Sequence, residues 1–301
     1  MAFHAGRLIE WYGEEGSGKS TLCYLSAAFA QKQYPEELVV YIDVEQAVDL
    51  NYAQKLGLCT EAHKFLLIQP NSGAEALQIM EDFVESGLCS AVILDSIAAL
   101  ITEQEKDGEA GDQFMAVLPR LLGAPIKRLI TSAKRSNTAC IFINQTRSTM
   151  AMYGSPTTTP GGKALKFGAS LRLEVRKKEF IKKGEINIGQ KIVVKTIKNR
   201  FGAPYGVTEI DLIFGEGVDQ VIESVDVAVE KGVIEQGGAW FTVTNSLKES
   251  LRFQGRTKVY DYFREFPQEL DYLKSLLYVK RESIVESINQ EDIAEVDNLD
   301  E

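Results

Sequence analysis

Gly13-Glu14-Glu15-Gly16-Ser17-Gly18-Lys19-Ser20 matches the phosphate-binding pattern G-x-x-x-x-G-K-[ST], and this stretch decides the fold. An apolar run at residues 8–12 precedes it and a helical pattern over 19–33 follows it. Glycines let the backbone curl so that its N–H groups point at phosphate oxygens, and the helix adds its positive end. Lys19 can reach the β- and γ-phosphates, and Ser20 can hold Mg²⁺. The predicted nucleotide site is Gly13, Glu14, Glu15, Gly16, Ser17, Gly18, Lys19, Ser20 and Thr21.

Apolar runs of strand length alternate with helical patterns along the first half of the chain. Strands are expected at 8–12, 38–42, 91–94 and 140–143, and helices at 19–33, 74–86 and 118–136. Apolar strands separated by helices predict an α/β fold with a mostly parallel, twisted sheet covered on both faces. In such sheets ligands bind at the carboxyl ends of the strands.

Three parts are expected along the chain. Residues 1–219 form the core, which contains two long aperiodic segments at about 102–114 and 146–163, and loops of that length are usually functional. A small α/β unit over 220–282 and an acidic, disordered tail over 283–301 follow.

Three polar residues follow or end predicted strands and are candidates for chemistry. Asp95 comes after the apolar run 91–94, which suits a carboxylate on the magnesium side, although Asp-Ser also suits a helix N-cap. Glu45 follows the strand that ends at residue 43 and is either a residue that activates water or an exposed loop glutamate. Gln145 ends the strand 140–144 and opens the second long segment, so its amide could contact a γ-phosphate.

The net charge of −10 argues at first against nucleic acid, but the charge is unevenly distributed. Residues 282–301 hold eight carboxylates and no lysine or arginine, whereas residues 163–200 hold twelve basic and three acidic residues. The basic stretch is either a surface for phosphate backbones or a solvated lysine face. No apolar run is long enough for a membrane span, no secretory signal is visible, and the cysteines lack metal-ligand spacing, which favours a cytoplasmic protein with reduced thiols.

The chain resembles the RecA family of bacterial and phage recombinases in a series of segments that run in order from Gly6 to about Gln268. The segments are residues 6–10, Tyr41-Ile42-Asp43-Val44-Glu45, Leu94-Asp95-Ser96-Ile97-Ala98-Ala99-Leu100, Phe142-Ile143-Asn144-Gln145, Thr157-Thr158-Thr159-Pro160-Gly161-Gly162-Lys163-Ala164-Leu165-Lys166-Phe167, Lys198-Asn199-Arg200, Phe214-Gly215-Glu216-Gly217 and Gly238-Ala239-Trp240. The threonine- and glycine-rich segment is far more specific than the phosphate loop alone. The resemblance implies a RecA-like P-loop NTPase core and a small C-terminal α/β domain.

Roles for individual residues follow from this resemblance. Glu45 resembles the residue that activates the attacking water, and Gln145 resembles the γ-phosphate sensor that couples ATP to DNA binding. Tyr52, with Asp49 and Phe214 nearby, resembles the residue that stacks on adenine. Lys198 and Arg200 resemble cations that reach the γ-phosphate of a neighbouring protomer; the family has lysine at the second position. Lys166 and Phe167 resemble protomer-interface residues, while periodicity alone favours a core role for Phe167.

The two long segments are similar to the DNA-binding loops of the family. The positions that resemble DNA contacts are Met115, Arg120, Lys127, Arg147, Met150, Gly161, Gly162 and Lys163. Side chains and glycine N–H groups that contact backbone phosphates give binding that is independent of sequence. The acidic tail resembles the autoinhibitory tail of the family.

The resemblance implies an ATP- and Mg²⁺-dependent ATPase that binds single-stranded DNA and exchanges strands with duplex DNA in recombination, repair and the SOS response. The chain begins where the core strand of the family begins, without the N-terminal helix and strand that pack on the adjacent protomer. The alternatives are therefore a non-filamenting RecA-like regulator of a recombinase and a ring-forming ATPase of related fold. Self-association into a helical filament is the expected assembly.

Overall fold

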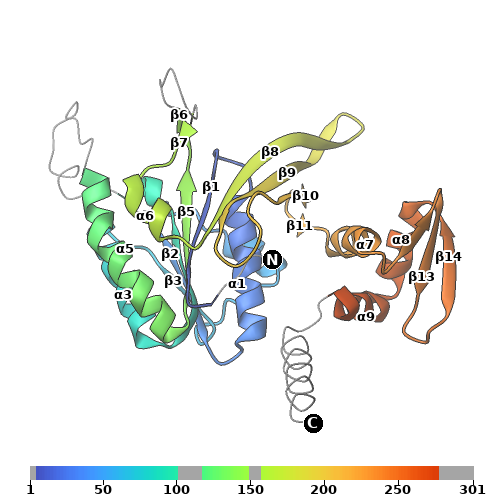
Figure 1. Ribbon diagram of the computed structural model, residues 1–301, viewed down its shortest axis with the longest axis horizontal. Coiled ribbons are helices and arrows are strands. Elements are labelled where there is room, and N and C mark those ends of the chain that lie inside the picture. The colour runs from blue at the N-terminus through green and yellow to red at the C-terminus, as the bar shows by residue number, and fades with distance from the viewer. Residues whose placement is uncertain (1–4, 101–116, 149–156, 278–301) are drawn as a thin grey trace, which may run out of the picture. The chain divides into compact units, whose positions relative to one another are not determined.

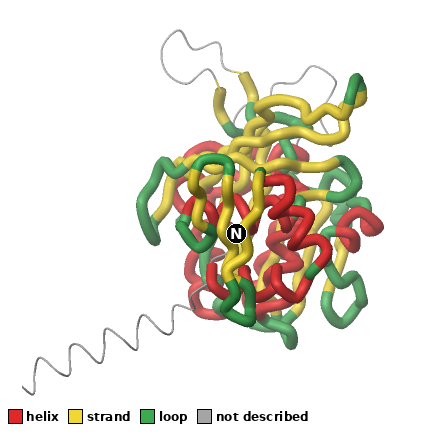
Figure 2. The backbone as a smooth tube through the Cα atoms, turned by 90° about the vertical axis from the view of Figure 1, so that its right-hand side faces the viewer, coloured by secondary structure: helices red, strands yellow, loops and turns green. Residues whose placement is uncertain are grey.

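The structure is a computed structural model and describes residues 5–100, 117–148 and 157–277 (Figure 1). The described residues form two compact units, which divide between residues 218 and 219. Figure 2 draws the strands in yellow and the helices in red and shows that both kinds of element run throughout the described chain.

A nine-stranded sheet lies at the centre of the first unit, within the described ranges. Its order is β11-β10-β9-β8-β1-β5-β4-β2-β3; neighbours from β8 to β3 pair in parallel, and the others pair antiparallel. The strands are β1 (Leu8–Gly13), β2 (Leu38–Asp43), β3 (Phe65–Ile68), β4 (Cys89–Asp95), β5 (Ala139–Gln145), β8 (Leu171–Lys183), β9 (Ile186–Asn199), β10 (Val207–Ile213) and β11 (Gly217–Val218). A separate short ribbon pairs β6 (Arg147–Ser148) with β7 (Thr157–Thr158). The predicted α/β fold with a mostly parallel sheet is confirmed.

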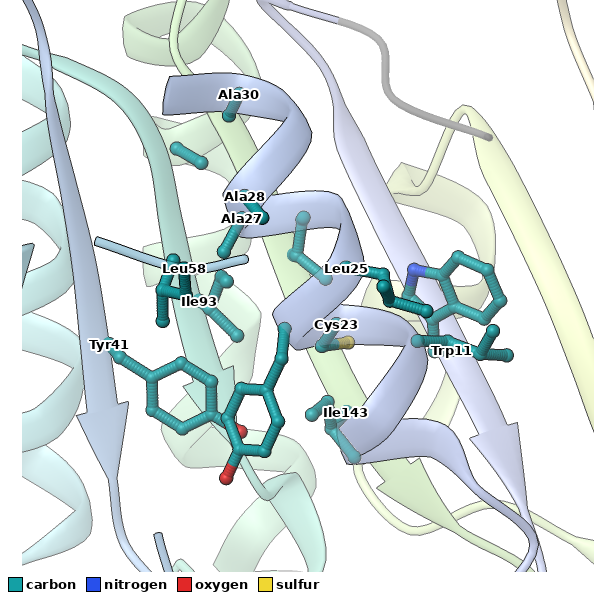
Figure 3. Close-up of a cluster of buried hydrophobic side chains, with 14 of the residues drawn as sticks. Trp11, Cys23, Leu25, Ala27, Ala28, Ala30, Tyr41, Leu58, Ile93 and Ile143 are labelled. Carbon is teal, nitrogen blue, oxygen red and sulfur yellow. The ribbon is translucent and has the colours of Figure 1, made fainter. Parts of the chain in front are cut away.

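Helices cover both faces of this sheet, because successive side chains of a buried strand point to opposite sides. The helices are α1 (Lys19–Gln33), α2 (Leu50–Lys55), α3 (Gly73–Ser86), the 3₁₀ turn η1 (Ile97–Ala99), α5 (Val117–Ser136) and α6 (Gly162–Gly168). One apolar cluster joins the sheet to α1 and α2, and a second joins its opposite face to α3, α5 and α6. Figure 3 shows part of the first cluster, where Ala27 and Cys23 of α1 lie against Ile93 and Ile143 of the sheet.

The hairpin of β8 and β9 is longer than hydrophobic alternation in the sequence would indicate. β8 has 13 residues and β9 has 14. Leu171, Leu173 and Val175 are buried, whereas β8 from Arg176 onward is largely exposed. The outer part of the hairpin lacks an apolar face. Hydrophobic alternation in the sequence therefore detects only the inner part of β8. Pairing with β9 carries the strand beyond the core, where Figure 1 shows the hairpin projecting.

The second unit has its own apolar cluster. Its elements are α7 (Gln220–Glu230), β12 (Glu235–Gly237), β13 (Trp240–Thr244), β14 (Ser250–Gln254), α8 (Arg256–Glu265) and α9 (Pro267–Leu277), with the three strands in one antiparallel sheet. The side chain of Asp219 caps α7 by accepting from the N–H groups of Val221 and Ile222. In neither unit is a described helix both long enough and apolar enough to cross a lipid bilayer.

Gly13→Ala is expected to lower the free energy of unfolding by about 2 kcal/mol or more. The added Cβ would lie 1.9 Å from the carbonyl oxygen of Val175, so backbone has to move. Gly123→Ala in α5 is the control, because a Cβ there meets no described atom within 4 Å and alanine favours a helix by roughly 0.5–1 kcal/mol. Chemical denaturation followed by circular dichroism measures both variants. Equal stability of the two would contradict the close packing of β1 on β8.

Candidate functional site

The phosphate loop lies between the end of β1 and the start of α1. Gly16 and Gly18 have φ angles of 68° and 92°, a region that glycine enters without steric cost. The Lys19 Nζ atom donates to the carbonyl oxygen of Glu14 at 2.6 Å and lies 3.5 Å from Ser17 Oγ. Burial lowers the pKa of Lys19, while the carboxylates of Asp95 and Glu45 oppose the shift. The ammonium group is thus held inside the curl of the loop.

A cavity of about 540 Å³ opens beside this loop. It is lined by Gly16, Gly18, Lys19, Ser20, Thr21, Asp49, Asn51, Tyr52, Lys55, Gln190, Phe214 and Gly215. The structure therefore brings the predicted adenine-side residues Asp49, Tyr52 and Phe214 to the predicted phosphate loop. The hydroxyl groups of Thr21 and Tyr52 lie 3.2 Å apart, and the Asp49 carboxylate accepts from the N–H of Tyr52 at the start of α2.

Asp95 ends β4 and faces the phosphate loop. Its Oδ2 atom accepts from Tyr41 OH at 2.6 Å and from Ser20 Oγ at 3.0 Å. Ser96 is the N-cap of the next turn, but its side chain does not cap the backbone of that turn. The pKa of Asp95 is raised to about 6, with burial as the largest cause; the hydrogen bonds from Tyr41 and Ser20 lower it, and the nearby carboxylates Glu45 and Asp43 raise it. The contact with Ser20 is what a magnesium-side carboxylate requires.

Glu45 and Gln145 meet at the carboxyl ends of β2 and β5. Gln145 Nε2 donates to Glu45 Oε1 at 2.9 Å, and Ser96 Oγ donates to the same oxygen. The loop that carries Glu45 is fixed by the buried carboxylate of Asp43, which accepts from the N–H groups of Ala47 and Val48. A carboxylate able to accept a proton and an amide able to detect a phosphate thus lie in direct contact.

The predicted protomer-interface residues lie outside the cavity. Lys198 Nζ donates to the carbonyl oxygens of Phe167 at 2.8 Å and Lys166 at 3.2 Å, and Arg200 Nη2 lies 3.3 Å from the Phe167 oxygen. Lys166 Nζ donates to Thr158 Oγ1 at 3.1 Å. The Phe167 side chain is 68% exposed, so the core role that periodicity favours is not found.

The predicted DNA contacts that the structure describes lie around α5, α6 and β6. Arg120, Lys127, Arg147 and Lys163 are exposed. Gly161 and Gly162 have φ angles of 90° and 70° at the start of α6. Met115 and Met150 lie outside the described residues, as do all of segment 102–114 and the centre of segment 146–163.

Sequence reasoning missed several polar residues of the site, among them Tyr41 and Gln190. Tyr41 is buried within β2 and contacts Asp95, and its polar tip at the end of an apolar run was an available signal. Gln190 lines the cavity and donates to the carbonyl oxygen of Gly16 at 2.9 Å. No local pattern marks Gln190, because the β8–β9 hairpin brings it to the loop from far along the chain.

Comparisons with known proteins agree with this geometry. The sequence profile of the RecA N-terminal domain matches residues 2–219. Protein RecA of Thermus aquaticus is 39% identical over 289 residues, covering 95% of this chain and 83% of that protein. Protein RecA of Thermus thermophilus is 40% identical over 282 residues, covering 93% and 81%. The crystal structure of the RadB recombinase aligns with a TM-score of 0.51 at 20% identity, covering 72% of this chain and 91% of that one, and supports the fold. The chain therefore belongs to the RecA family of DNA-dependent recombination ATPases.

Proposed function

We propose that the chain binds ATP in the cavity beside α1 and uses its terminal phosphate to control the grip of residues 146–163 on single-stranded DNA. Membership of the family makes it an ATPase of homologous recombination and repair. The observation that carries the coupling is the contact between Gln145 and Glu45, because Gln145 is the residue at which β5 enters the DNA segment. Homologous pairing and strand exchange are the reaction that this coupling serves.

The cavity fits a nucleotide with its metal. Its lining includes Tyr52 and Phe214 as well as the phosphate loop with Lys19. Ser20 and Asp95 are two oxygen donors in contact, the ligand type that Mg²⁺ prefers. Ser20 and Asp95 would hold Mg²⁺ there, and the ion would supply positive charge to the phosphate groups of the nucleotide. Lys19 binds these oxygens directly, and Thr21 and Tyr52 orient the nucleoside.

Hydrolysis follows from rearrangement of the Glu45 contacts. The Gln145 amide turns to donate to the γ-phosphate and releases one of the hydrogen bonds to Glu45 Oε1. Glu45 then takes a proton from the water that attacks phosphorus, while the bond from phosphorus to the β,γ-bridging oxygen breaks and ADP leaves. Ser96 keeps the Glu45 carboxylate in place. The same turn displaces the segment that follows Gln145. Nucleotide state and DNA affinity change together.

Sequence-independent DNA binding is supported by the described parts of that segment. Arg147 and Lys163 supply exposed charges, and Gly161 and Gly162 supply backbone N–H groups without a side chain in the way. Lys198 and Arg200 are held at the end of α6 by main-chain carbonyl groups, which directs them toward the exposed Phe167. We infer that this face meets the nucleotide of a neighbouring protomer in a filament.

Glu45→Gln is expected to lower the rate of ATP hydrolysis in the presence of single-stranded DNA by about 100-fold or more, since the proton acceptor is lost. The affinity for nucleotide is expected to stay within about threefold, because Glu45 lies outside the lining of the cavity. Phosphate release with and without DNA, together with titration of a fluorescent ADP, measures both quantities. A wild-type rate that DNA does not stimulate would reject the coupling.

Asp95→Asn is expected to stabilise the metal-free protein at pH 8. The folded-state pKa of Asp95 is about 6, raised from the ordinary value of 3.8, so the protonated carboxyl favours folding. Its stabilising effect is complete below pH 3.8 and is lost as the pH rises through about 6. The gain for asparagine at pH 8 is about 3 kcal/mol and shrinks as the pH falls below 6.

Urea denaturation in EDTA at several pH values measures this gain, with the exposed Asp82→Asn as the control. A gain that does not change with pH would contradict the shifted pKa of Asp95.

A further inference from the structure

A row of polar side chains crosses the sheet on the face that α6 covers. It consists of Asn144 on β5, Glu10 on β1, Arg172 on β8 and Lys198 on β9, which are four adjacent strands. Glu10 pairs with Arg172, and Arg172 pairs with Lys198, in the strand registers. Cross-strand partners share a face. We call these four residues the polar row.

The centre of the polar row is a buried ion pair. Glu10 is fully buried, and its Oε2 atom lies 2.5 Å from Arg172 Nε. Its Oε1 atom accepts from Asn144 Nδ2 at 3.0 Å, and Asn144 is also fully buried. The Arg172 guanidinium carbon lies 4.7 Å from the centre of the Tyr12 ring. Apolar residues of similar volume often replace such a pair without loss of stability, so stability alone does not explain it.

The polar row holds both ends of α6. Asn144 Nδ2 also donates to the carbonyl oxygen of Pro160 at 3.1 Å, just before the helix begins. At the other end Lys198 Nζ donates to the carbonyl oxygens of Lys166 and Phe167. Burial lowers the pKa of Lys198, and the guanidinium groups of Arg200 and Arg172 lower it further. A helix of seven residues is thereby fixed to the sheet at its entry and its exit.

The polar row also reaches the nucleotide side of the sheet. Asn144 Oδ1 accepts from the backbone N–H of Gln145 at 3.0 Å. The Asn144 amide therefore contacts the main chain at Gln145, the main chain at Pro160, and the Glu10 carboxylate. A movement of the Gln145 backbone changes the support of the entry to α6.

We infer that Glu10 is a positioning residue that transmits movement between Gln145, the DNA segment before α6, and Lys198 at its end. The inference rests on the proposed function. Glu10 contacts neither the cavity lining nor the exposed basic residues, and it acts through Asn144 and Arg172. Without the Glu10 carboxylate, α6 keeps its apolar contact through the buried Leu165 but loses its fixed position on the sheet.

The test compares two glutamates in full-length protein. The variant is Glu10→Gln and the control is Glu81→Gln, because Glu81 is also buried in an ion pair, with Arg128 at 2.9 Å, but lies between α3 and α5 away from the polar row. The coupling ratio is the Kd for labelled poly-thymidine without nucleotide divided by its Kd with a slowly hydrolysed ATP analogue. We expect Glu10→Gln to lower this ratio by about tenfold, within the usual range of coupling strengths. Glu81→Gln is expected to leave it unchanged.

Two further measurements separate positioning from loss of stability. The Kd for fluorescent ADP is expected to stay within about threefold in both variants. Hydrogen exchange of the amides of residues 162–168 is expected to be faster in Glu10→Gln than in Glu81→Gln. Asn144→Ala serves as a second variant in case Glu10→Gln fails to fold. It leaves the Glu10–Arg172 ion pair in place and removes the contact with Pro160, and it is expected to lower the coupling ratio and to speed amide exchange in the same way.

The outcomes are distinct. A coupling ratio near one in the wild type overturns the proposed function and the inference with it. A large wild-type ratio that Glu10→Gln and Asn144→Ala both retain overturns the inference alone. A lower ratio in both variants, with unchanged ADP binding and faster exchange in α6, supports it.

Discussion

A sheet buried on both faces constrains where this protein can place polar chemistry. The interior strands β1, β5, β4 and β2 lie between two apolar clusters, so most of their polar side chains stand at the carboxyl ends. Gly13, Asp43, Asp95 and Gln145 are the last residues of those four strands. Parallel pairing in register brings these ends to one edge. The catalytic edge of the site is therefore a direct product of the topology, because strand pairing alone brings these four positions together.

That topology explains why much of the site was predictable. The phosphate loop, Asp95, Glu45 and Gln145 each end or follow an apolar run, and in a parallel sheet such positions converge. Tyr52, Asp49 and Phe214 depended on the resemblance, because no local pattern joins them to the loop. Gln190 and the polar row escaped prediction for a different reason. Both depend on the register of β8 and β9, and a hairpin with an exposed outer part shows no apolar alternation from which that register could be read.

Most polar side chains of the interior strands stand at the carboxyl ends of those strands, and the polar row is the exception. Glu10 lies in the middle of β1, where an apolar residue would be expected, and Arg172 lies directly opposite on β8. A local conflict of this kind between position and residue type often marks a functional constraint. The neighbours of the Glu10–Arg172 ion pair indicate what this constraint is. The polar row holds α6, which begins at the second DNA segment and ends near the exposed Phe167.

The full use of the Asn144 amide has a thermodynamic consequence. Its nitrogen serves Glu10 and Pro160, and its oxygen serves Gln145. Linkage between two equilibria is reciprocal, so whatever factor ATP contributes to the hold on DNA, DNA must contribute to the hold on ATP. A polynucleotide that immobilises the segment before α6 would thus retain the nucleotide as well, and occupancy of either ligand would report on the other.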